Sequence, residues 1–278
     1  MVKKIAYQGR EGAYSNLACK SFFPKYHAYG YASFDDVFEQ VKEGNVDLGI
    51  LPIENSYAGR VPEIHNLLSQ TNLYIVGEYF QEIKHCLAAP QGVKLNDLEE
   101  VCSHAHALMQ CSKKIKKHKL KKISYSNTAA AAEYIAKQND PKIATICSGY
   151  AAKINNLKIL DKNFSDIKDN YTIFIAIAKK IDYLKLKNSA KITTMLFTVR
   201  NIPASIYKAL GGFASNQINL LKIESYIAGG ASKEAQFFVS FIGSPDEKKV
   251  QYALEELGFY TKNTKLLGVY NAARERGL

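Results

Sequence analysis

Three adjacent polar side chains, Glu54, Asn55 and Ser56, follow an apolar run at residues 48–53. A buried strand that ends here would carry them to the mouth of a sheet, where open α/β folds bind ligands. The Asn55 amide could donate to a carboxylate or a hydroxyl, or it could cap a turn. Glu54 could contact a ligand or pair with a buried basic residue. The segment therefore indicates a ligand site at a strand end.

Two further segments carry groups suited to binding an anion. Gln110 lies seven residues after Ser103, so a strand-to-helix turn and two helical turns could bring both toward one cleft. Gln110 could instead be a helix-surface amide. Thr128 precedes an alanine run at 129–132. At a helix N-terminus it would stand where free amides and a partial positive charge attract a carboxylate, or it would serve only as a cap.

The composition is that of an ordinary soluble protein. The 278 residues are 47% hydrophobic and 23% charged, which suggests one large or two modest domains. No apolar run reaches the ~18 residues of a membrane helix, and the N-terminus predicts a strand and not a signal peptide. We therefore expect a cytoplasmic protein without membrane partners.

Cysteine and histidine spacing gives no sign of a metal site. The five cysteines contain no Cys-x-x-Cys pair, so we expect buried small hydrophobes. His104 and His106 lack a set of acids or cysteines around them, and structural hydrogen bonding is the expected role. The net charge is +11, and the densest run of lysines lies at 113–122. A solvated helix face explains this run best, attraction of an anionic substrate second, and nucleic-acid binding a distant third.

The pattern of apolar residues predicts two parts joined by a linker at 182–190. The first part alternates strands and helices, which implies a parallel or mixed sheet with helices on its faces. Its expected strands are at 3–8, 46–53, 73–80, 83–89, 101–104, 123–125, 142–146 and 171–178. Its expected helices include one that runs without a break over 105–117. The second part has the order βαββαβ of a ferredoxin-like unit, with elements expected at 191–200, 203–215, 218–227, 235–242, 246–257 and 265–269.

Several motifs in the same order resemble those of the prephenate dehydratase family. Residues 52–61 match its P-I-E-N-S-x-x-G-x-V string, and similar matches occur at 9–15, 84–87, 103–111 and 128–132. The resemblance implies an α/β fold with a two-lobed, periplasmic-binding-protein-like catalytic domain at 1–181, whose second lobe covers about 81–160. It also implies that the βαββαβ unit, at 191–278, is a regulatory ACT domain.

The activity implied by the resemblance is that of a lyase in phenylalanine biosynthesis. Prephenate, a small dianion, loses CO2 and water to give phenylpyruvate. This elimination requires no metal or redox cofactor, and the resemblance implies none. One positioned proton donor contributes roughly 10²–10⁴-fold to such a step. The rival interpretations are an arogenate dehydratase and a non-catalytic amino-acid-sensing module. A non-catalytic module should have lost Thr172 or Asn55, and both are present.

The resemblance also assigns residues to the site. Thr172 matches the threonine of the family's Thr-Arg-Phe motif and is the expected catalytic residue, although a lone threonine in a strand is usually only a β-former. Ile173 replaces the arginine, which implies a different substrate, a compensating base elsewhere or reduced activity. The expected substrate-binding residues are Glu54, Asn55, Ser56, Ser103, Gln110, Thr128 and Phe174.

A second resemblance concerns the C-terminal part. Residues 218–225 are similar to the I-N-L-x-K-I-E-S string that binds phenylalanine in the family's regulatory domain. It implies an L-phenylalanine effector at Asn219, Leu220, Glu224 and Ser225. Tyr226 and Ala204 replace an arginine and a glycine of the family's signature, so we expect a weak or altered response. The apolar face and free edges of one βαββαβ unit predict a homodimer or homotetramer.

Overall fold

The computed structural model describes residues 2–181, 184, 186, 190–227 and 235–278. It divides into two compact units. The first comprises Met1–Val37, Ile50–Val61 and Phe80–Phe174, and the second comprises Phe38–Gly49, Pro62–Tyr79 and Ile175–Leu278. Every substrate-site residue expected from the sequence belongs to the first unit, and every expected effector residue belongs to the second.

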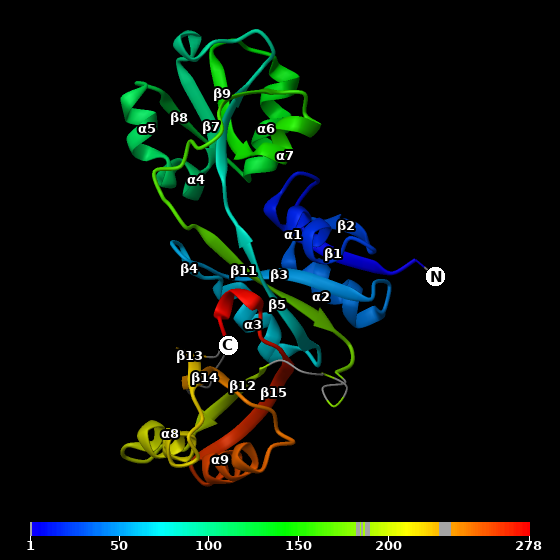
Figure 1. Cartoon of the computed structure of the whole chain (residues 1–278), viewed down its shortest axis with the longest axis vertical. Helices are drawn as coiled ribbons and strands as arrows, with labels where there is room; N and C mark the ends of the chain where they lie inside the picture. Colours follow the sequence, from blue (N-terminus) through cyan, green and yellow to red (C-terminus); the bar gives the residue numbers. More distant parts are fainter. Residues whose placement is uncertain (1, 182–183, 185, 187–189, 228–234) are drawn as a thin grey trace. The chain divides into compact units, whose positions relative to one another are not determined.

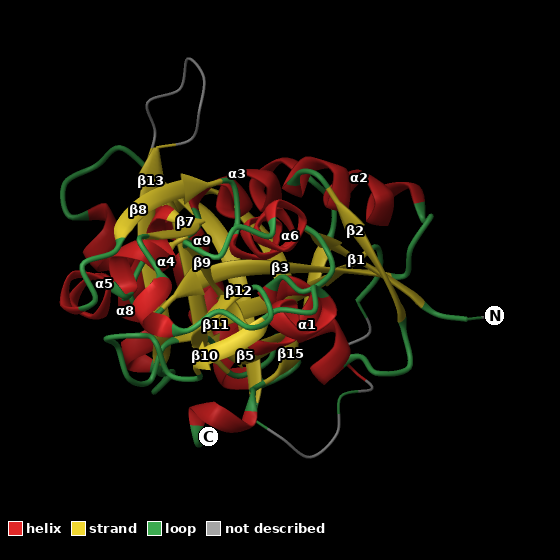
Figure 2. Cartoon of the chain, turned by 90° about the horizontal axis from the view of Figure 1, so that it is seen from above, coloured by secondary structure: helices red, strands yellow, loops and turns green. Residues whose placement is uncertain are grey.

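The first unit begins with β1 (Lys4–Gln8), α1 (Tyr14–Phe22) and β2 (His27–Tyr31). β1 and β2 pair in parallel, and the two strands lie side by side in Figures 1 and 2. The sequence did not predict β2. The strands β3 (Leu48–Asn55), β5 (Tyr74–Glu82) and β11 (Tyr171–Ala178) contribute residues to both units, and the short β4 (Gly59–Arg60) pairs with the end of β3.

A five-stranded sheet forms the rest of the first unit, in the order β10-β6-β9-β7-β8. Helices cover both of its faces, with α4 and α5 on one side and α6 and α7 on the other (Figure 1). Successive side chains of each strand point to opposite faces, so Leu87 joins one core cluster and Cys86 the other. All five cysteines are free and buried, as predicted. The strands are β6 (His85–Ala89), β7 (Glu100–His104), β8 (Lys121–Tyr125), β9 (Ile143–Ser148) and β10 (Lys158–Asp161), and the helices are α4 (Ala105–Gln110), α5 (Ser112–Lys117), α6 (Thr128–Gln138) and α7 (Gly149–Ile154).

The single helix predicted at 105–117 is wrong, because α4 ends before Cys111 and α5 starts after it. The break leaves backbone amides at the start of α5 without helical partners. The Asp166 carboxylate accepts from the amides of Lys113 (2.6 Å) and Lys114 (3.1 Å). A residue far along the chain thus stabilises the new helix start.

The second unit contains the predicted βαββαβ arrangement. Its strands are antiparallel to their neighbours in the order β13-β14-β12-β15, and α8 and α9 pack on one face (Figure 1). The elements are β12 (Lys191–Val199), α8 (Ser205–Ser215), β13 (Leu220–Ile227), β14 (Ala235–Ile242), α9 (Lys248–Tyr260) and β15 (Thr261–Asn271). The unit also includes α3 (Pro62–Gln70) and most of α2 (Phe34–Glu43). The predicted linker at 182–190 lies mostly outside the described residues.

Two predicted helix boundaries in this unit are wrong. α8 begins at Ser205 and not at Pro203, because Ala204 has a left-handed backbone with φ of 58°. α9 continues through Gly258 to Tyr260, because this glycine keeps a negative φ. Within the described part of the chain, no helix is both long and apolar enough to cross a bilayer.

Candidate active site

Asn55, at the end of β3, holds Thr172 through a side-chain hydrogen bond. Its Oδ1 accepts from the backbone amides of Tyr57 (3.0 Å) and Ala58 (2.9 Å). Its Nδ2 lies within bonding distance of Asn170 Oδ1 (2.9 Å), the Tyr171 carbonyl (2.9 Å) and Thr172 Oγ1 (3.0 Å). The Asn55 side chain therefore has its acceptor and both donor hydrogens committed within the protein.

Thr172 is left with a proton to give. Its Oγ1 accepts from Asn55, and within the described residues no group accepts the Thr172 hydroxyl proton. The residue is half-buried on β11. A hydroxyl that receives one hydrogen bond and has its own O–H unengaged is suited to donate to a ligand oxygen.

Gln110 is the second residue with a free donor. It ends α4 and is 6% exposed. Its Oε1 lies 2.8 Å from His85 Nε2 and 3.2 Å from Asn170 Nδ2. Its Nε2 amide has no hydrogen-bond partner in the described part of the chain. This NH2 group can donate to an anionic ligand.

His85 is neutral and carries its proton on Nε2. The Gln110 oxygen can only accept, so His85 Nε2 is the donor, and His85 Nδ1 faces the Tyr14 hydroxyl at 3.2 Å. With this tautomer, the single proton of the Tyr14 hydroxyl has two acceptors within reach, His85 Nδ1 and the Lys84 carbonyl at 2.8 Å. Burial lowers the pKa of His85 despite the opposing effect of the Gln110 bond. The neutral ring is therefore favoured near neutral pH.

Three of the predicted substrate-binding residues serve the framework in this structure. Ser103 is 0% exposed and its hydroxyl donates to the Ile146 carbonyl at 2.5 Å. Ser56 Oγ accepts from the Tyr171 amide (3.0 Å), and Phe174 is 2% exposed in the core. Their contact with substrate stays a prediction. In the structure, the hydrogen bonds of Ser103 and Ser56 hold strand ends together.

Thr128 occupies the first position of α6, and its neighbour provides the cap. Asn127 Oδ1 accepts from the Ala130 amide at 2.7 Å. Among the residues that the structure describes, the Thr128 hydroxyl has no hydrogen-bond partner. The N-terminus of this helix therefore offers an unused hydroxyl beside its free amides.

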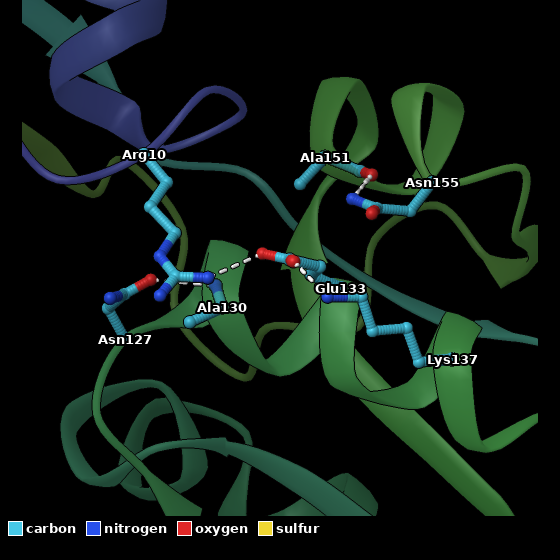
Figure 3. A network of polar contacts seen from close by, with 7 residues as sticks. All are labelled: Arg10, Asn127, Ala130, Glu133, Lys137, Ala151 and Asn155. Carbon is cyan, nitrogen blue, oxygen red and sulfur yellow. Dashed lines mark hydrogen bonds and ion pairs between the residues drawn. The ribbon is translucent and has the colours of Figure 1, made fainter. Parts of the chain in front are cut away.

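Arg10, within the segment at 9–15 that resembles a family motif, lies near the same helix. Arg10 Nη1 is 2.6 Å from Glu133 Oε2, and Lys137 Nζ is 2.6 Å from Glu133 Oε1. The guanidinium lies between Asn127 and Glu133 in Figure 3. Side-chain hydrogen bonds from Lys137 and Arg10 lower the pKa of Glu133. Arg10 thus adds a positive charge near the start of α6.

The remaining predicted residue of this site is Glu54, which is half-buried opposite Arg60 in the β3–β4 pairing. His104 caps α4 by accepting from the His106 amide at 3.4 Å, which agrees with the structural role expected for it. The described residues contain no group of three histidines, cysteines or acids that could hold a metal ion.

The predicted effector residues lie on or beside β13 in the second unit. Asn219 and Ser225 are exposed. Glu224 Oε2 is 3.1 Å from His65 Nε2, and Glu224 Oε1 is 3.2 Å from Lys222 Nζ. Burial raises the pKa of the neighbouring Tyr226 to about 12. Leu220, the first residue of β13, is half-buried.

Sequence reasoning missed Asn170 and did not assign a role to His85, Tyr14 or Arg10. Asn170 is 2% exposed and bonds to Asn55 and Gln110. The available signal was its place directly before the strand of Thr172, where an amide would reach the end of a neighbouring strand.

The fold and this site define an α/β enzyme with an attached ferredoxin-like unit, and comparison with known proteins identifies its family. The family model for prephenate dehydratase matches residues 5–182. A bifunctional N-acyl-homoserine lactone acylase/prephenate dehydratase of Komagataeibacter europaeus is 37% identical over 97% of this chain and 96% of its own. The chain belongs to the prephenate dehydratase family, and the predicted family and fold class are confirmed.

Other relatives and solved structures agree. Arogenate dehydratase/prephenate dehydratase 2 of Arabidopsis thaliana is 37% identical over 96% of this chain and 72% of its own. The structure of GqqA, described as a novel type of quorum quenching acylase, has a TM-score of 0.91 and 36% identity, covering 99% of this chain and 100% of its own. Prephenate dehydratase from Arthrobacter aurescens in complex with L-Phe has a TM-score of 0.90 and 26% identity, covering 98% of this chain and 91% of its own.

Proposed function

We propose that this chain converts prephenate to phenylpyruvate in phenylalanine biosynthesis, with Thr172 as the proton donor to the leaving hydroxyl. The observation that carries this proposal is the hydrogen bond from Asn55 Nδ2 to Thr172 Oγ1 (3.0 Å). It leaves the threonine proton unengaged and supplies a fixed dipole to the oxygen that loses it.

The chemistry assigns each group a step. The bond between the ring and its carboxylate breaks and releases CO2, and the electron pair moves into the ring. The C–O bond then breaks, and the departing oxygen takes the Thr172 proton and leaves as water. A threonine hydroxyl is a weak acid, so the developing negative charge on Oγ1 needs the preorganised Asn55 donor. A proton from solvent restores Thr172 afterwards.

The substrate carries two carboxylates, and the site offers hydrogen-bond donors for both of them. The Gln110 NH2 and the Thr128 hydroxyl have no partners among the described residues, and Arg10 adds a positive charge near the start of α6. We propose that these groups hold the two carboxylates. Because Arg10 is already paired with Glu133, its contribution depends on sharing the guanidinium between the two anions.

Arogenate is the second candidate substrate, and Ile173 is the observation that favours it. In arogenate an ammonium-bearing carbon replaces the keto group, so the demand for positive charge falls. Ile173 places an uncharged side chain beside Thr172 on β11, and a Petunia hybrida relative that is 36% identical is named arogenate dehydratase 2. Steady-state rates with both acids, measured side by side, decide between them.

The Komagataeibacter relative is also named for an acylase activity. In this chain the Ser103 hydroxyl donates to a backbone carbonyl, and the Ser56 hydroxyl accepts from a backbone amide. Neither serine has the histidine partner of an activated nucleophile. We therefore propose only the dehydratase activity.

We propose that the part of the second unit at 191–278 is an ACT domain that binds L-phenylalanine at Asn219, Leu220, Glu224 and Ser225. Ala204 supports a weakened response, because its φ of 58° is a conformation that favours the family's glycine. β13 is an edge strand with Ile223 43% exposed, which supports pairing with a second copy. Light scattering that shows a monomer at micromolar concentration would exclude this pairing.

The experiment that tests the catalytic proposal compares Thr172→Val with Thr172→Ser. Valine keeps the shape but removes the hydroxyl, so we expect kcat to fall by roughly 10²–10⁴-fold, with the melting temperature little changed. Serine keeps the hydroxyl and should retain most activity. Wild-type turnover of both prephenate and arogenate by Thr172→Val would refute the role of Thr172.

A further inference from the structure

We propose that Asn170 and His85 are positioning residues that turn the NH2 group of Gln110 toward the substrate. This inference rests on the proposed function, because it explains how Gln110 comes to attract a carboxylate. A side-chain amide can face a ligand with either end. Only the NH2 end attracts an anion, while the carbonyl end repels it.

Asn170 fixes which end of Gln110 faces the protein, and the Nε2–H tautomer of His85 fits that orientation. His85 Nε2 (2.8 Å) and Asn170 Nδ2 (3.2 Å) both approach the same Gln110 oxygen. His85 is 3% exposed, Asn170 2% and Gln110 6%, so water competes little for these bonds. Turning the Gln110 amide over would set its hydrogens against those of Asn170 Nδ2, which would lose its acceptor, and would require the other tautomer of His85.

The orientation of Asn170 is itself fixed by a chain that begins at the backbone. The amides of Tyr57 and Ala58 can only donate, so Asn55 must turn its Oδ1 toward them. Asn55 Nδ2 then donates to Asn170 Oδ1 at 2.9 Å, and Asn170 Nδ2 is left to face Gln110. The polarity of the substrate-facing amide thus follows from two backbone N–H groups of the turn after β3.

This chain of donors predicts that Asn170→Asp reverses the Gln110 amide. Aspartate has the same shape and still accepts from Asn55, but it cannot donate to Gln110 while ionised. Gln110 would turn its NH2 toward the new carboxylate and present its carbonyl to the substrate. The loss of one charge-assisted hydrogen bond corresponds to about 10- to 100-fold in kcat/KM.

A double-mutant cycle separates positioning from general damage. We expect Asn170→Asp to lower kcat/KM about 10- to 100-fold in the wild-type background and by less than about 3-fold in the Gln110→Ala background, where no amide remains to turn. Asn163→Asp is the matched control. Asn163 is exposed, lines the same cavity of about 510 Å³ as Asn170, and has no side-chain bond to Gln110. It should leave kcat/KM unchanged.

His85→Phe is the second variant, in case the buried aspartate prevents folding. It keeps a ring at this position but removes the donor, so it should weaken kcat/KM in the wild-type background and not in the Gln110→Ala background. An equal loss in both backgrounds, from either variant, would overturn the proposal, as would wild-type activity of Asn170→Asp.

A spectroscopic readout keeps this inference separate from the proposed function. The side-chain NH2 signals of Gln110 in a ¹H–¹⁵N spectrum are assigned by their loss in Gln110→Ala. They should shift in Asn170→Asp and stay in place in Asn163→Asp. If the wild type turns over neither acid, the proposed function fails, and these signals still decide the positioning. Unchanged Gln110 signals in Asn170→Asp would refute it.

Discussion

Arg276 and Glu78 form a buried carboxylate–guanidinium pair in the second unit. Arg276→Leu tests how much this pair contributes to the stability of the protein. The side chain of Glu78 is 2% exposed and that of Arg276 21%. Arg276 Nε lies 2.5 Å from Glu78 Oε1, and Nη2 lies 2.8 Å from Oε2. The Ala273 amide donates to the same carboxylate at 3.2 Å. The pair ties the segment after β15 to β5.

Arg276→Leu removes both guanidinium bonds and leaves Glu78 with one backbone donor. Breaking a buried pair by removing one partner costs about 3–5 kcal/mol, because the remaining charge stays buried without compensation. For a chain of this size each kcal/mol shifts the melting temperature by roughly 2–4 °C. We therefore expect circular dichroism to show a melting temperature lowered by about 10 °C.

Two comparisons make this test specific. Arg274→Leu changes an exposed arginine of the same segment, and its effect should stay within about 0.5 kcal/mol, as for most surface substitutions. The double variant Glu78→Leu with Arg276→Leu removes both charges and should be more stable than Arg276→Leu alone. If Arg276→Leu melts like Arg274→Leu, the buried pair does not stabilise the protein as argued.

Three further predictions concern the stability contributed by single residues. Burial lowers the pKa of His85, so the stability that the neutral ring contributes is complete above the ordinary pKa near 6.5 and is lost as pH falls through the folded pKa. Urea denaturation should therefore show a smaller loss of stability between pH 7 and 5 in His85→Phe than in the wild type. An identical loss in the two proteins would contradict this. Lys265 donates to three backbone carbonyls at the end of α3, and Lys265→Met should cost about 2–3 kcal/mol in the same assay. Gly268→Ala would place a Cβ 2.1 Å from the Ile75 carbonyl oxygen and should lower stability by more than about 3 kcal/mol, whereas Gly258→Ala, inside α9 with open space around it, should raise it by up to about 1 kcal/mol.

The end of β3 and the strand that carries Thr172 lie side by side in the structure. Asn55, however, makes its hydrogen bonds within the protein and not to a ligand. The sequence indicated an amide that could donate to a ligand or cap a turn. In the structure Asn55 accepts from the turn amides and donates to Thr172. Its partners Asn170 and Thr172 lie 115 and 117 residues away, and no local pattern specifies which strands place them side by side.

Elements with a clear period were predicted, and those stabilised by distant groups were not. The βαββαβ order followed from alternating and helical patterns in 191–271. β2 was missed because His27–Tyr31 has no apolar run. Position 30 of this strand accommodates only glycine, because a Cβ there would lie 2.4 Å from the Gly9 carbonyl oxygen. The break between α4 and α5 was missed because its stabilising carboxylate, Asp166, lies 53 residues beyond Lys113.

The polar residues of the site divide by whether their hydrogen bonds are already satisfied. Asn55, Ser56 and Ser103 make their bonds within the protein, while Thr172 and Gln110 each keep a donor unengaged in the described part of the chain. Substitution in the first group should therefore lower activity by moving Thr172 or Gln110, together with a loss of stability. Loss of the Thr172 hydroxyl should lower activity with stability nearly intact, because Asn55 Nδ2 keeps Asn170 Oδ1 and the Tyr171 carbonyl as acceptors. Loss of Gln110 should lower both activity and stability, because its Oε1 also accepts from buried groups. The polar residues assigned to the site thus contribute in two ways, and the hydrogen-bond distances in the structure separate the two groups.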